Sequence, residues 1–312
     1  MLTPPGHGGL IRNIGLTLAA YLGAPFVIWR LKIASDQAIT AENRVIANRF
    51  AKAADQLYSV RRITHKSPDD SSIQIEEEQP NFEVRIGGLY ALKHILEDSK
   101  RYQIQVCTAL CAYIRFNSLR ELSADCNKND ELTCKKWFID VQTALEIIGY
   151  ISQEQRAYER DNCFCLNLSG ANLQWKDLKG MNFQAVDFEN ADFRNAKLEK
   201  SDLTHAFLGG CKFEGAVLDK CKFDRASLRD ADLSKAKGLD LESLKRAHGV
   251  KIGYGKTKLP DKLLPPENWF KAEDSYEDPV AFREAYRAHF LKTYEKDPEF
   301  KRFSEPFNKR NL

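Results

Sequence analysis

The side chains that could hold a metal ion or act as nucleophiles are eight cysteines and six histidines. Cys107 and Cys111 are one turn apart in a predicted helix, so both thiols face the same side, as two ligands of one metal ion would. No histidine or third cysteine is spaced to complete a tetrahedral set around them. We therefore interpret both as small buried residues and predict no metal site and no bound cofactor.

Sequence patterns that are typical of catalysis are absent. The chain contains no glycine-rich phosphate loop, no GxSxG nucleophile turn and no HExxH zinc motif, and its histidines are scattered. The cysteines form no CxxC pair and no regular framework, which indicates free thiols in a reducing compartment rather than a disulfide scaffold. The sequence therefore predicts a protein that is not an enzyme.

The composition indicates an ordered chain and excludes several classes of protein. Its 312 residues are 43% hydrophobic and 29% charged, which argues against wholesale disorder and against a membrane protein with many spans. At this length we expect about two domains, each long enough to bury a core. The formal net charge of +3 is too small to indicate a nucleic-acid partner.

One segment near the start of the chain is apolar enough to meet a membrane. Ile14–Trp29 is a run of 16 residues without a charge, and Arg12 precedes it while Arg30 and Lys32 follow. A spanning helix needs about 20 apolar residues, with a lower limit near 17. The run reaches that limit when Arg30 and Leu31 are included, because the side chain of Arg30 can extend to the membrane interface.

We predict a single transmembrane helix over residues 14–31, within an N-terminal segment of residues 1–34. A buried helix of a soluble domain and a helix lying in the membrane interface are the alternatives. The positive charges on the C-terminal side of the run favour a membrane-associated protein with the bulk of its chain in the cytoplasm.

Residues 36–160 carry a helical pattern and are predicted to form an all-α module of short antiparallel helices. Helices are expected over residues 82–99, 102–116 and roughly 134–152. The polar stretch over residues 61–80 has no sustained period and is predicted to be a loop or linker. The first helix of the module has one apolar stripe with a single polar member: Ile39, Asn43, Ile46, Phe50, Ala53 and Leu57.

Two features of this module bear on its packing. The stripe of the first helix fits an amphipathic helix packed on its neighbour, and self-association near a membrane is the alternative. Gly87 and Gly88 interrupt a strongly helical pattern. Because glycine weakens a helix, we expect close packing against another helix at these positions.

A strict five-residue repeat is the most specific pattern in the sequence. A period of five fits neither an α-helix nor a strand, so we predict a solenoid in which the chain turns once per repeat. In each five-residue unit, the residue two places before the repeated leucine or phenylalanine is nearly always small or apolar. We expect the side chains of both residues to point inward. The repeated position holds leucine or phenylalanine fourteen times in succession: Leu168, Leu173, Leu178, Phe183, Phe188, Phe193, Leu198, Leu203, Leu208, Phe213, Leu218, Phe223, Leu228 and Leu233.

The repeat resembles the motif A-(D/N)-L-x-x of the pentapeptide-repeat family, which Ala171–Leu173, Ala191–Phe193 and Ala231–Leu233 match. This resemblance implies a right-handed quadrilateral β-helix with four repeats per coil, which we assign to residues 164–237. The predicted fold class is therefore mixed, with an N-terminal all-α module followed by this pentapeptide-repeat solenoid.

Four repeats per coil would stack residues that are twenty positions apart. Cys211 and Cys221 then point inward, where burial makes a thiol unreactive. Lys176 is the one charged residue at a small inward position, and we expect it to distort the first coil or to extend outward. His205 occupies an outward position and is interpreted as a solvated surface residue rather than a base.

The residues on both sides of the repeat also resemble parts of this family. The helical module is similar to one that precedes the repeats in many membrane-associated bacterial members, which supports the membrane anchor. Residues 238–270 resemble the C-terminal flank of such proteins, with Thr257–Pro260 and Pro266–Trp269 as its elements, and are expected to cap the open coil end. The tail over residues 271–312 is charged and contains one predicted helix at Val280–Lys292.

These observations predict a protein-interaction or scaffold module that is tethered to the cytoplasmic face of a membrane and binds a protein partner. Three outward apolar residues of the repeat, Trp175, Phe207 and Val217, are the candidate contacts. They do not share one stacked column, so they define no single hot spot. Chance exposure, or contact with a capping segment, is the alternative for each of them.

The alternative function is a soluble inhibitor or protector of a type II topoisomerase, because some pentapeptide-repeat proteins are acidic rods that imitate duplex DNA. Such mimicry requires negative charge along the rod, in place of phosphates. Twelve basic and eleven acidic side chains lie between Leu166 and Lys237. This balance disfavours mimicry, and we expect no direct binding to nucleic acid.

Overall fold

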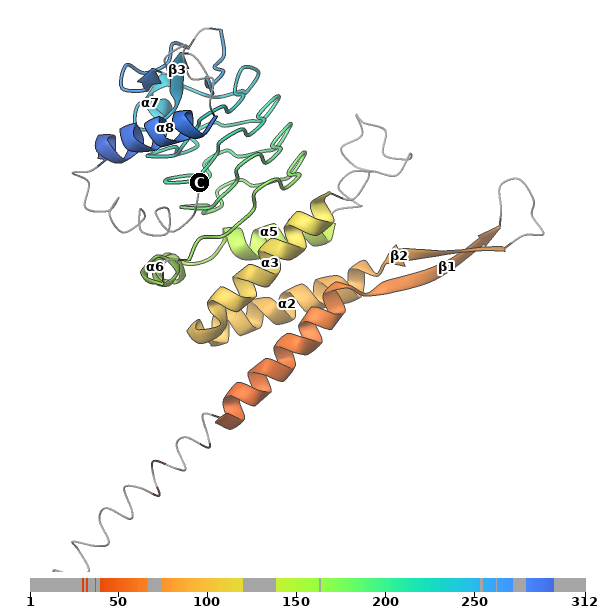
Figure 1. Ribbon diagram of the computed structural model, residues 1–312. Coiled ribbons are helices and arrows are strands. Elements are labelled where there is room, and N and C mark those ends of the chain that lie inside the picture. The colour runs from red at the N-terminus through yellow and green to blue at the C-terminus, as the bar shows by residue number, and fades with distance from the viewer. Residues whose placement is uncertain are drawn as a thin grey trace, which may run out of the picture. The chain divides into compact units, whose positions relative to one another are not determined.

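A computed structural model describes the greater part of the chain (Figure 1). The chain divides into two compact units, Met1–Lys52 and Ala53–Leu312. The predicted transmembrane run lies outside the described residues except for Arg30, and none of the helices that the structure describes is long and apolar enough to cross a membrane. The described residues are 30, 32, 37, 40–66, 74–119, 139–162, 164–252, 255–261, 263–271 and 279–294.

A module of packed helices precedes the repeat, as the apolar periods predict. Its helices are α2 (Phe82–Asp98), α3 (Gln103–Ser118), α5 (Ile139–Gly149) and α6 (Gln153–Asp161), with a 3-10 turn at Lys100–Tyr102 between the first two. The helices α2, α3 and α5 pack against one another and enclose an apolar core (Figure 1). Cys107 and Cys111, which lie one turn apart on α3, are both buried in that core.

A hydrogen-bonded polar cluster joins the three packed helices inside the module. The guanidinium of Arg85 on α2 lies 3.6 Å from the carboxylate of Asp140 on α5 and donates to Asn117 Oδ1 on α3 at 3.2 Å. The hydroxyl of Tyr113 donates to the same carboxylate at 2.6 Å. Because buried charges are tolerated only when they are paired and hydrogen-bonded, this cluster specifies how the three helices pack.

The glycine pair of α2 has two different environments. A Cβ atom on Gly88 would lie 2.8 Å from the carbonyl oxygen of Ala53, so the close approach to the preceding helix, which is described over residues 40–57, requires glycine there. A Cβ atom on Gly87 would meet nothing within 4 Å. Close packing therefore explains one glycine and not the other.

Residues 61–66 and 74–80 belong to the two strands of a β-hairpin instead of the predicted linker. The strands β1 (Val60–Lys66) and β2 (Gln74–Pro80) pair antiparallel. Their register places Arg62 of β1 opposite Glu78 of β2, and Arg62 Nε lies 3.3 Å from Glu78 Oε1. Because each strand is polar on its own, the favourable pairing of opposite charges becomes visible only when the two strands face each other.

The repeat winds into coils of twenty residues, which the bridges between stacked coils define. Parallel bridges run from Asn167↔Asp187 to Val217↔Lys237, always between residues twenty apart, so four repeats complete one coil. Each side of a coil contributes a single bridged residue rather than an extended strand. All fourteen repeated leucines and phenylalanines are at most 1% exposed. The coils therefore form a stacked β-helical solenoid with a filled interior.

The interior columns bring together residues that are far apart in sequence. The rings of Phe193 and Phe213 stack at 5.0 Å with an interplanar angle of 2°. The Sγ atom of Cys221 lies 3.2 Å from Ser201 Oγ, twenty residues earlier. Lys176 is only 6% exposed and the neighbouring bridge Asp177↔Lys197 is intact, so, contrary to the expectation, this lysine neither reaches solvent nor interrupts the coil.

The corners of the coils require a left-handed backbone at every fifth residue. Gly210 and Gly215 adopt φ values of +68° and +71°. A Cβ atom on either glycine would also collide with the side chain of an asparagine in the coil before, Asn190 or Asn195. Glycine at these two corners leaves room for the asparagine side chains and suits the positive φ, although other corners, such as His205, hold larger residues at a similar φ.

The segment after the repeat continues the stack and closes its C-terminal end. The amides of Leu228 and Leu233 donate to the carbonyl oxygens of His248 and Lys258 at 2.7 and 2.8 Å. The side chain of Trp269 is buried, and its indole nitrogen donates to Ala247 O at 3.0 Å. The regular elements here are α7 (Leu241–Leu244), β3 (Val250–Ile252) and β4 (Phe270–Lys271), and β3 and β4 pair in parallel.

The helix α8 (Pro279–Tyr294) covers the predicted Val280–Lys292 and packs on the repeat instead of standing apart as a tail. The ring of Phe290 contacts Phe207 of the repeat, and Tyr286 belongs to a buried cluster with Val250 and Phe270. Residues 295–312 lie outside the described part of the chain.

The five-residue register makes a specific prediction for two adjacent residues. Phe193 is fully buried, so Phe193→Ala should lower the free energy of unfolding by about 3–5 kcal/mol. The twenty-residue spacing favours Glu214 as the partner of Arg194, but the guanidinium pairs with Asp192 at 2.7 Å instead. Arg194→Ala removes only this partly exposed ion pair and should cost at most about 1 kcal/mol.

Chemical denaturation of both variants and of the unchanged protein measures this contrast. The pair Leu198→Ala and Glu199→Ala serves as the matched control one repeat later, because Leu198 is buried and Glu199 is not. Equal losses of stability at the inward and outward positions would contradict the coil geometry.

Candidate interaction surface

The helical module supplies the hydrogen-bond acceptors that the first coil of the repeat lacks. In the inner coils, the amides of Asp192, Lys197 and Asp202 donate to carbonyl oxygens of the coil before. The first coil has no such neighbour, so the equivalent amides need other acceptors. Asn172 N donates to Ser118 Oγ at 3.1 Å, Asp177 N to Gln142 Oε1 at 3.2 Å and Asn182 N to Gly149 O at 2.7 Å.

A buried arginine connects this cap to the helix α6. The guanidinium of Arg156 donates to Ile148 O at 2.7 Å and to Asn182 O at 2.6 Å, and it pairs with Glu159 at 2.8 Å. One side chain thus joins α5, α6 and the first coil. The sequence around Arg156 is so polar that it indicates a solvated helix, and nothing in its pattern predicts a buried ion pair.

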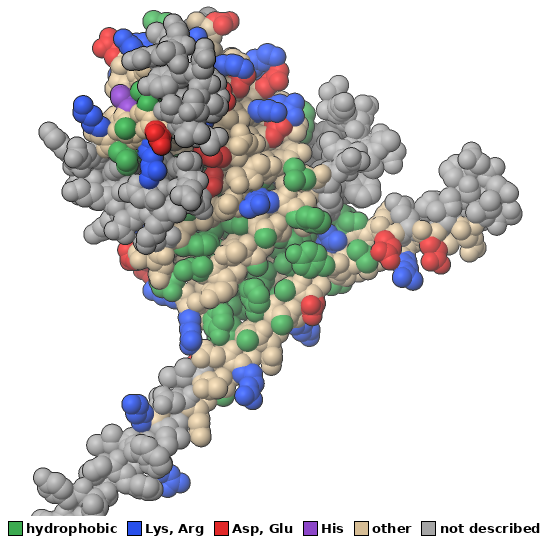
Figure 2. Space-filling model, in the orientation of Figure 1, with side chains coloured by type: hydrophobic (Ala, Val, Ile, Leu, Met, Phe, Trp, Pro, Cys, Tyr) green, Lys and Arg blue, Asp and Glu red, His purple; other side chains and the backbone are tan. Residues whose placement is uncertain are grey.

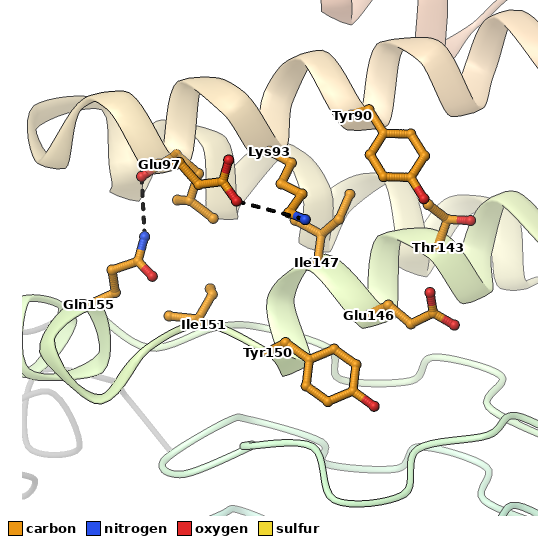
Figure 3. Close-up of a pocket in the computed structure, with 10 residues that line it drawn as sticks. Tyr90, Lys93, Glu97, Thr143, Glu146, Ile147, Tyr150, Ile151 and Gln155 are labelled. Atoms are coloured by element: carbon orange, nitrogen blue, oxygen red, sulfur yellow. Dashed lines mark hydrogen bonds and ion pairs between the residues drawn. The ribbon is translucent and has the colours of Figure 1, made fainter.

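A groove of about 280 Å³ lies between α2 and α5 and ends near α6 (Figure 3). Its wall includes Leu96, Ile147 and Ile151, which are buried. Tyr90 from α2 and Tyr150 from the end of α5 flank it and are 47% and 65% exposed. Tyrosine combines a large apolar ring with a hydroxyl that can form a hydrogen bond, which suits it to binding a protein partner.

Charged groups line the rim of the groove. The ammonium of Lys93 lies 3.7 Å from the carboxylate of Glu97, and Glu146 lies on the opposite helix (Figure 3). The hydroxyl of Tyr150 donates to Lys179 O of the first coil at 3.4 Å. The groove therefore combines an apolar interior with a polar rim, which is the usual anatomy of a protein-binding site.

The structure does not bring the three predicted contact residues together. Trp175, Phe207 and Val217 are all half-buried, and they lie in different columns of the solenoid. Phe207 is packed against Phe290 of α8, so in this conformation it contacts the chain itself. Trp175 and Val217 remain candidate contacts.

His205 is not the solvated residue that its outward repeat position predicts. It is 5% exposed, although it stands at a corner of the coil with a φ of +61°. The repeat register fixes the direction of a side chain relative to the coil, but it does not say which other segments cover that side. The interpretation of His205 as a surface residue was therefore wrong.

Charges of opposite sign alternate along the outer columns of the solenoid. Lys179 pairs with Glu199 at 2.8 Å in the next coil, and Lys222 pairs with Asp202 at 3.4 Å in the coil before it. Basic and acidic side chains are intermixed on the visible face of the repeat (Figure 2). Negative charge is thus neutralised within the solenoid, whereas an imitation of DNA needs it uncompensated.

Four thiols in the described part of the chain are deeply buried and show no sign of activation. Burial raises the pKa of Cys111 and of Cys221 to about 12, and it also raises the pKa of Cys107 and Cys211. Such thiols stay protonated and are poor nucleophiles. In the part of the chain that the structure describes, no group of three histidine, cysteine or acidic side chains could hold a metal ion.

The groove is the feature that the sequence did not indicate. Its two tyrosines stand in helices whose apolar periods predict only which face is buried. The exposed side of each helix carries no pattern that would relate Tyr90 to Tyr150, sixty residues later. Hydrophobic side chains gather over the helical module on the visible face (Figure 2), whereas charged side chains are more frequent on the visible part of the repeat.

Stacked twenty-residue coils with capped ends define the protein as a β-solenoid repeat protein. The family described as pentapeptide repeats matches residues 167–204 and 198–234, with eight copies of the repeat. Over these residues the chain belongs to the pentapeptide-repeat family. Proteins of this kind are in general structural or interaction modules. No curated protein is significantly similar to the chain.

Solved structures of pentapeptide repeat proteins are similar to part of the chain. The match to Rfr23 from the cyanobacterium Cyanothece 51142 has 25% identity, covers 33% of this chain and 65% of that one, and has a TM-score of 0.21. The match to a pentapeptide repeat protein of the Arabidopsis thaliana thylakoid lumen has 26% identity, covers 24% of this chain and 55% of that one, and has a TM-score of 0.14. The match to HetL from Nostoc sp. strain PCC 7120 has 27% identity, covers 27% of this chain and 50% of that one, and has a TM-score of 0.12. The chain spans less than two thirds of each.

Proposed function

We propose that the chain is a non-enzymatic protein-interaction module whose groove between α2 and α5 receives an apolar side chain or short segment of a protein partner. The observation that carries this proposal is the groove itself, with exposed Tyr90 and Tyr150 beside buried apolar residues. The module around it is rigid, because the buried Arg85 cluster holds its helices together. A preformed site of this kind loses little conformational freedom on binding.

The repeat has a supporting role in this proposal. Its interior is filled and its two ends are closed by the helical module and by residues 238–270, so it offers only its outer surface. The resemblance to the family further implies a right-handed, four-sided form for the coils. We propose that this solenoid is a stable base that positions the helical module.

We also propose that residues 14–31 anchor the chain in a membrane and leave its bulk on the cytoplasmic side. Support comes from the uncharged run Ile14–Trp29 and from Arg30 and Lys32, which follow it directly. A membrane anchor would confine the interaction module to the membrane surface, where its partner is then expected.

Substitution of the groove tyrosines tests the interaction site. Tyr90→Ala together with Tyr150→Ala should weaken the binding of the partner at least tenfold, because exposed aromatic anchors carry much of the energy of such interfaces. Phe116→Ala is the matched control, since Phe116 is 72% exposed in the same module and does not line the groove. The measurement is quantitative recovery of proteins bound to the full chain in membranes of the source cells.

A protein that is recovered with the wild type and the control but is lost with the tyrosine variant supports the proposal. The proposal is contradicted when every bound protein is recovered equally with all three forms. Thermal unfolding of the three purified chains shows whether the tyrosine variant has kept its stability.

Fractionation of cells tests the membrane anchor. The full chain should sediment with membranes and require detergent for release, while a chain that starts at Ser35 should remain in the soluble fraction and fold. The physical reason is the transfer of the apolar run from water to hydrocarbon. Full-length protein in the soluble fraction without detergent would contradict the anchor.

A further inference from the structure

The contact between α8 and the repeat centres on one buried histidine. The ring of His248 packs against three α8 rings, those of Tyr286, His289 and Phe290, each with a centroid distance of 5.0 Å. His248 itself belongs to the segment that closes the coil stack and bridges Ser227. The side chain of His248 is fully buried while α8 is docked.

The two histidine rings contact each other directly. They are stacked with an interplanar angle of 16°, and His248 Nε2 lies 3.3 Å from His289 Nδ1. A hydrogen bond between these atoms requires one N–H group and one unprotonated nitrogen. Two protonated rings would place two donors and two positive charges against each other. The docked geometry thus fits neutral histidines.

Several polar groups surround the two rings. From α8 they include the Tyr286 hydroxyl, which donates to His248 O at 3.3 Å, and the Lys292 ammonium. The repeat contributes the Ser227 hydroxyl, 3.0 Å from the Tyr286 hydroxyl, and β4 contributes the apolar ring of Phe270.

These surroundings disfavour the charged form of both histidines. Burial, and then the neighbouring His289, lower the pKa of His248 to about 3. Burial and then Lys292 lower the pKa of His289 as well. Both rings therefore bind protons less readily in the docked state than histidine does in water.

We propose that α8 is a pH-sensitive latch, which stays docked on the repeat while His248 and His289 are neutral and is released when acid protonates them. Release would uncover Phe207, the outward apolar residue of the repeat that Phe290 contacts in the docked state. This device goes beyond the interaction site proposed above and does not depend on it.

The direction of the pH effect follows from proton binding in the two states. A released, solvated His248 has a pKa near 6.5, so between about pH 3 and pH 6.5 the released state binds more protons than the docked state. Docking is therefore strongest above pH 6.5 and weakens as the pH falls. At pH 5 the contribution of His248 alone should shift the equilibrium about 30-fold toward release.

Amide hydrogen exchange of the full chain in detergent micelles tests the latch. Protection factors, which remove the intrinsic pH dependence of exchange, should fall about 30-fold in α8 between pH 7.5 and pH 5, while those of the inner coils stay unchanged. The matched variant carries His248→Phe and His289→Phe, which keep two packed aromatic rings and cannot titrate. Its α8 protection should be the same at both pH values.

Unchanged protection of α8 in the wild type would overturn the latch, and so would an equal loss in the wild type and the double variant. If the double variant leaves α8 unprotected at both pH values, NMR titration of the His248 ring in the wild type decides. Protonation that coincides with the loss of α8 protection supports the latch, and protonation while α8 stays protected overturns it.

Discussion

The backbone of a stacked coil must find hydrogen-bond partners at both ends of the stack, and much of this structure follows from that requirement. Inner coils bond to the coil on either side, but the first coil has amides that face no further coil. The three amides of Asn172, Asp177 and Asn182 are satisfied by Ser118, Gln142 and Gly149. The helical module is therefore part of the solenoid's fold rather than a separate attachment.

This requirement also constrains how the helices of the module are held together. Acceptors that come from α3 and α5 match three amides only if the two helices hold a fixed spacing. The buried cluster of Arg85, Asp140 and Tyr113 provides that constraint inside the module, and Arg156 joins the module to the first coil. The same rigidity preserves the groove beside α5, so one set of contacts serves both the cap and the proposed interaction site.

The sequence predicts the parts of the fold that a local period determines. The repeated leucines and phenylalanines are buried, and the apolar periods locate α2, α3, most of α5 and α8. The β-hairpin could not be predicted, because the charge pair Arg62–Glu78 forms only across two polar strands. The burial of His205 and the cover over Phe207 depend on segments that are distant in sequence, and no period reports such contacts.

The helical module closes the first coil, and amide hydrogen exchange of the full chain tests this closure residue by residue. If the cap acts as described, the amides of Asn172, Asp177 and Asn182 should be protected to within about tenfold of their inner-coil equivalents Asp192 and Lys197, because both sets exchange only when the solenoid opens. Exchange of the first-coil amides at nearly the rate of an unfolded chain, with the inner coils still protected, would contradict the account.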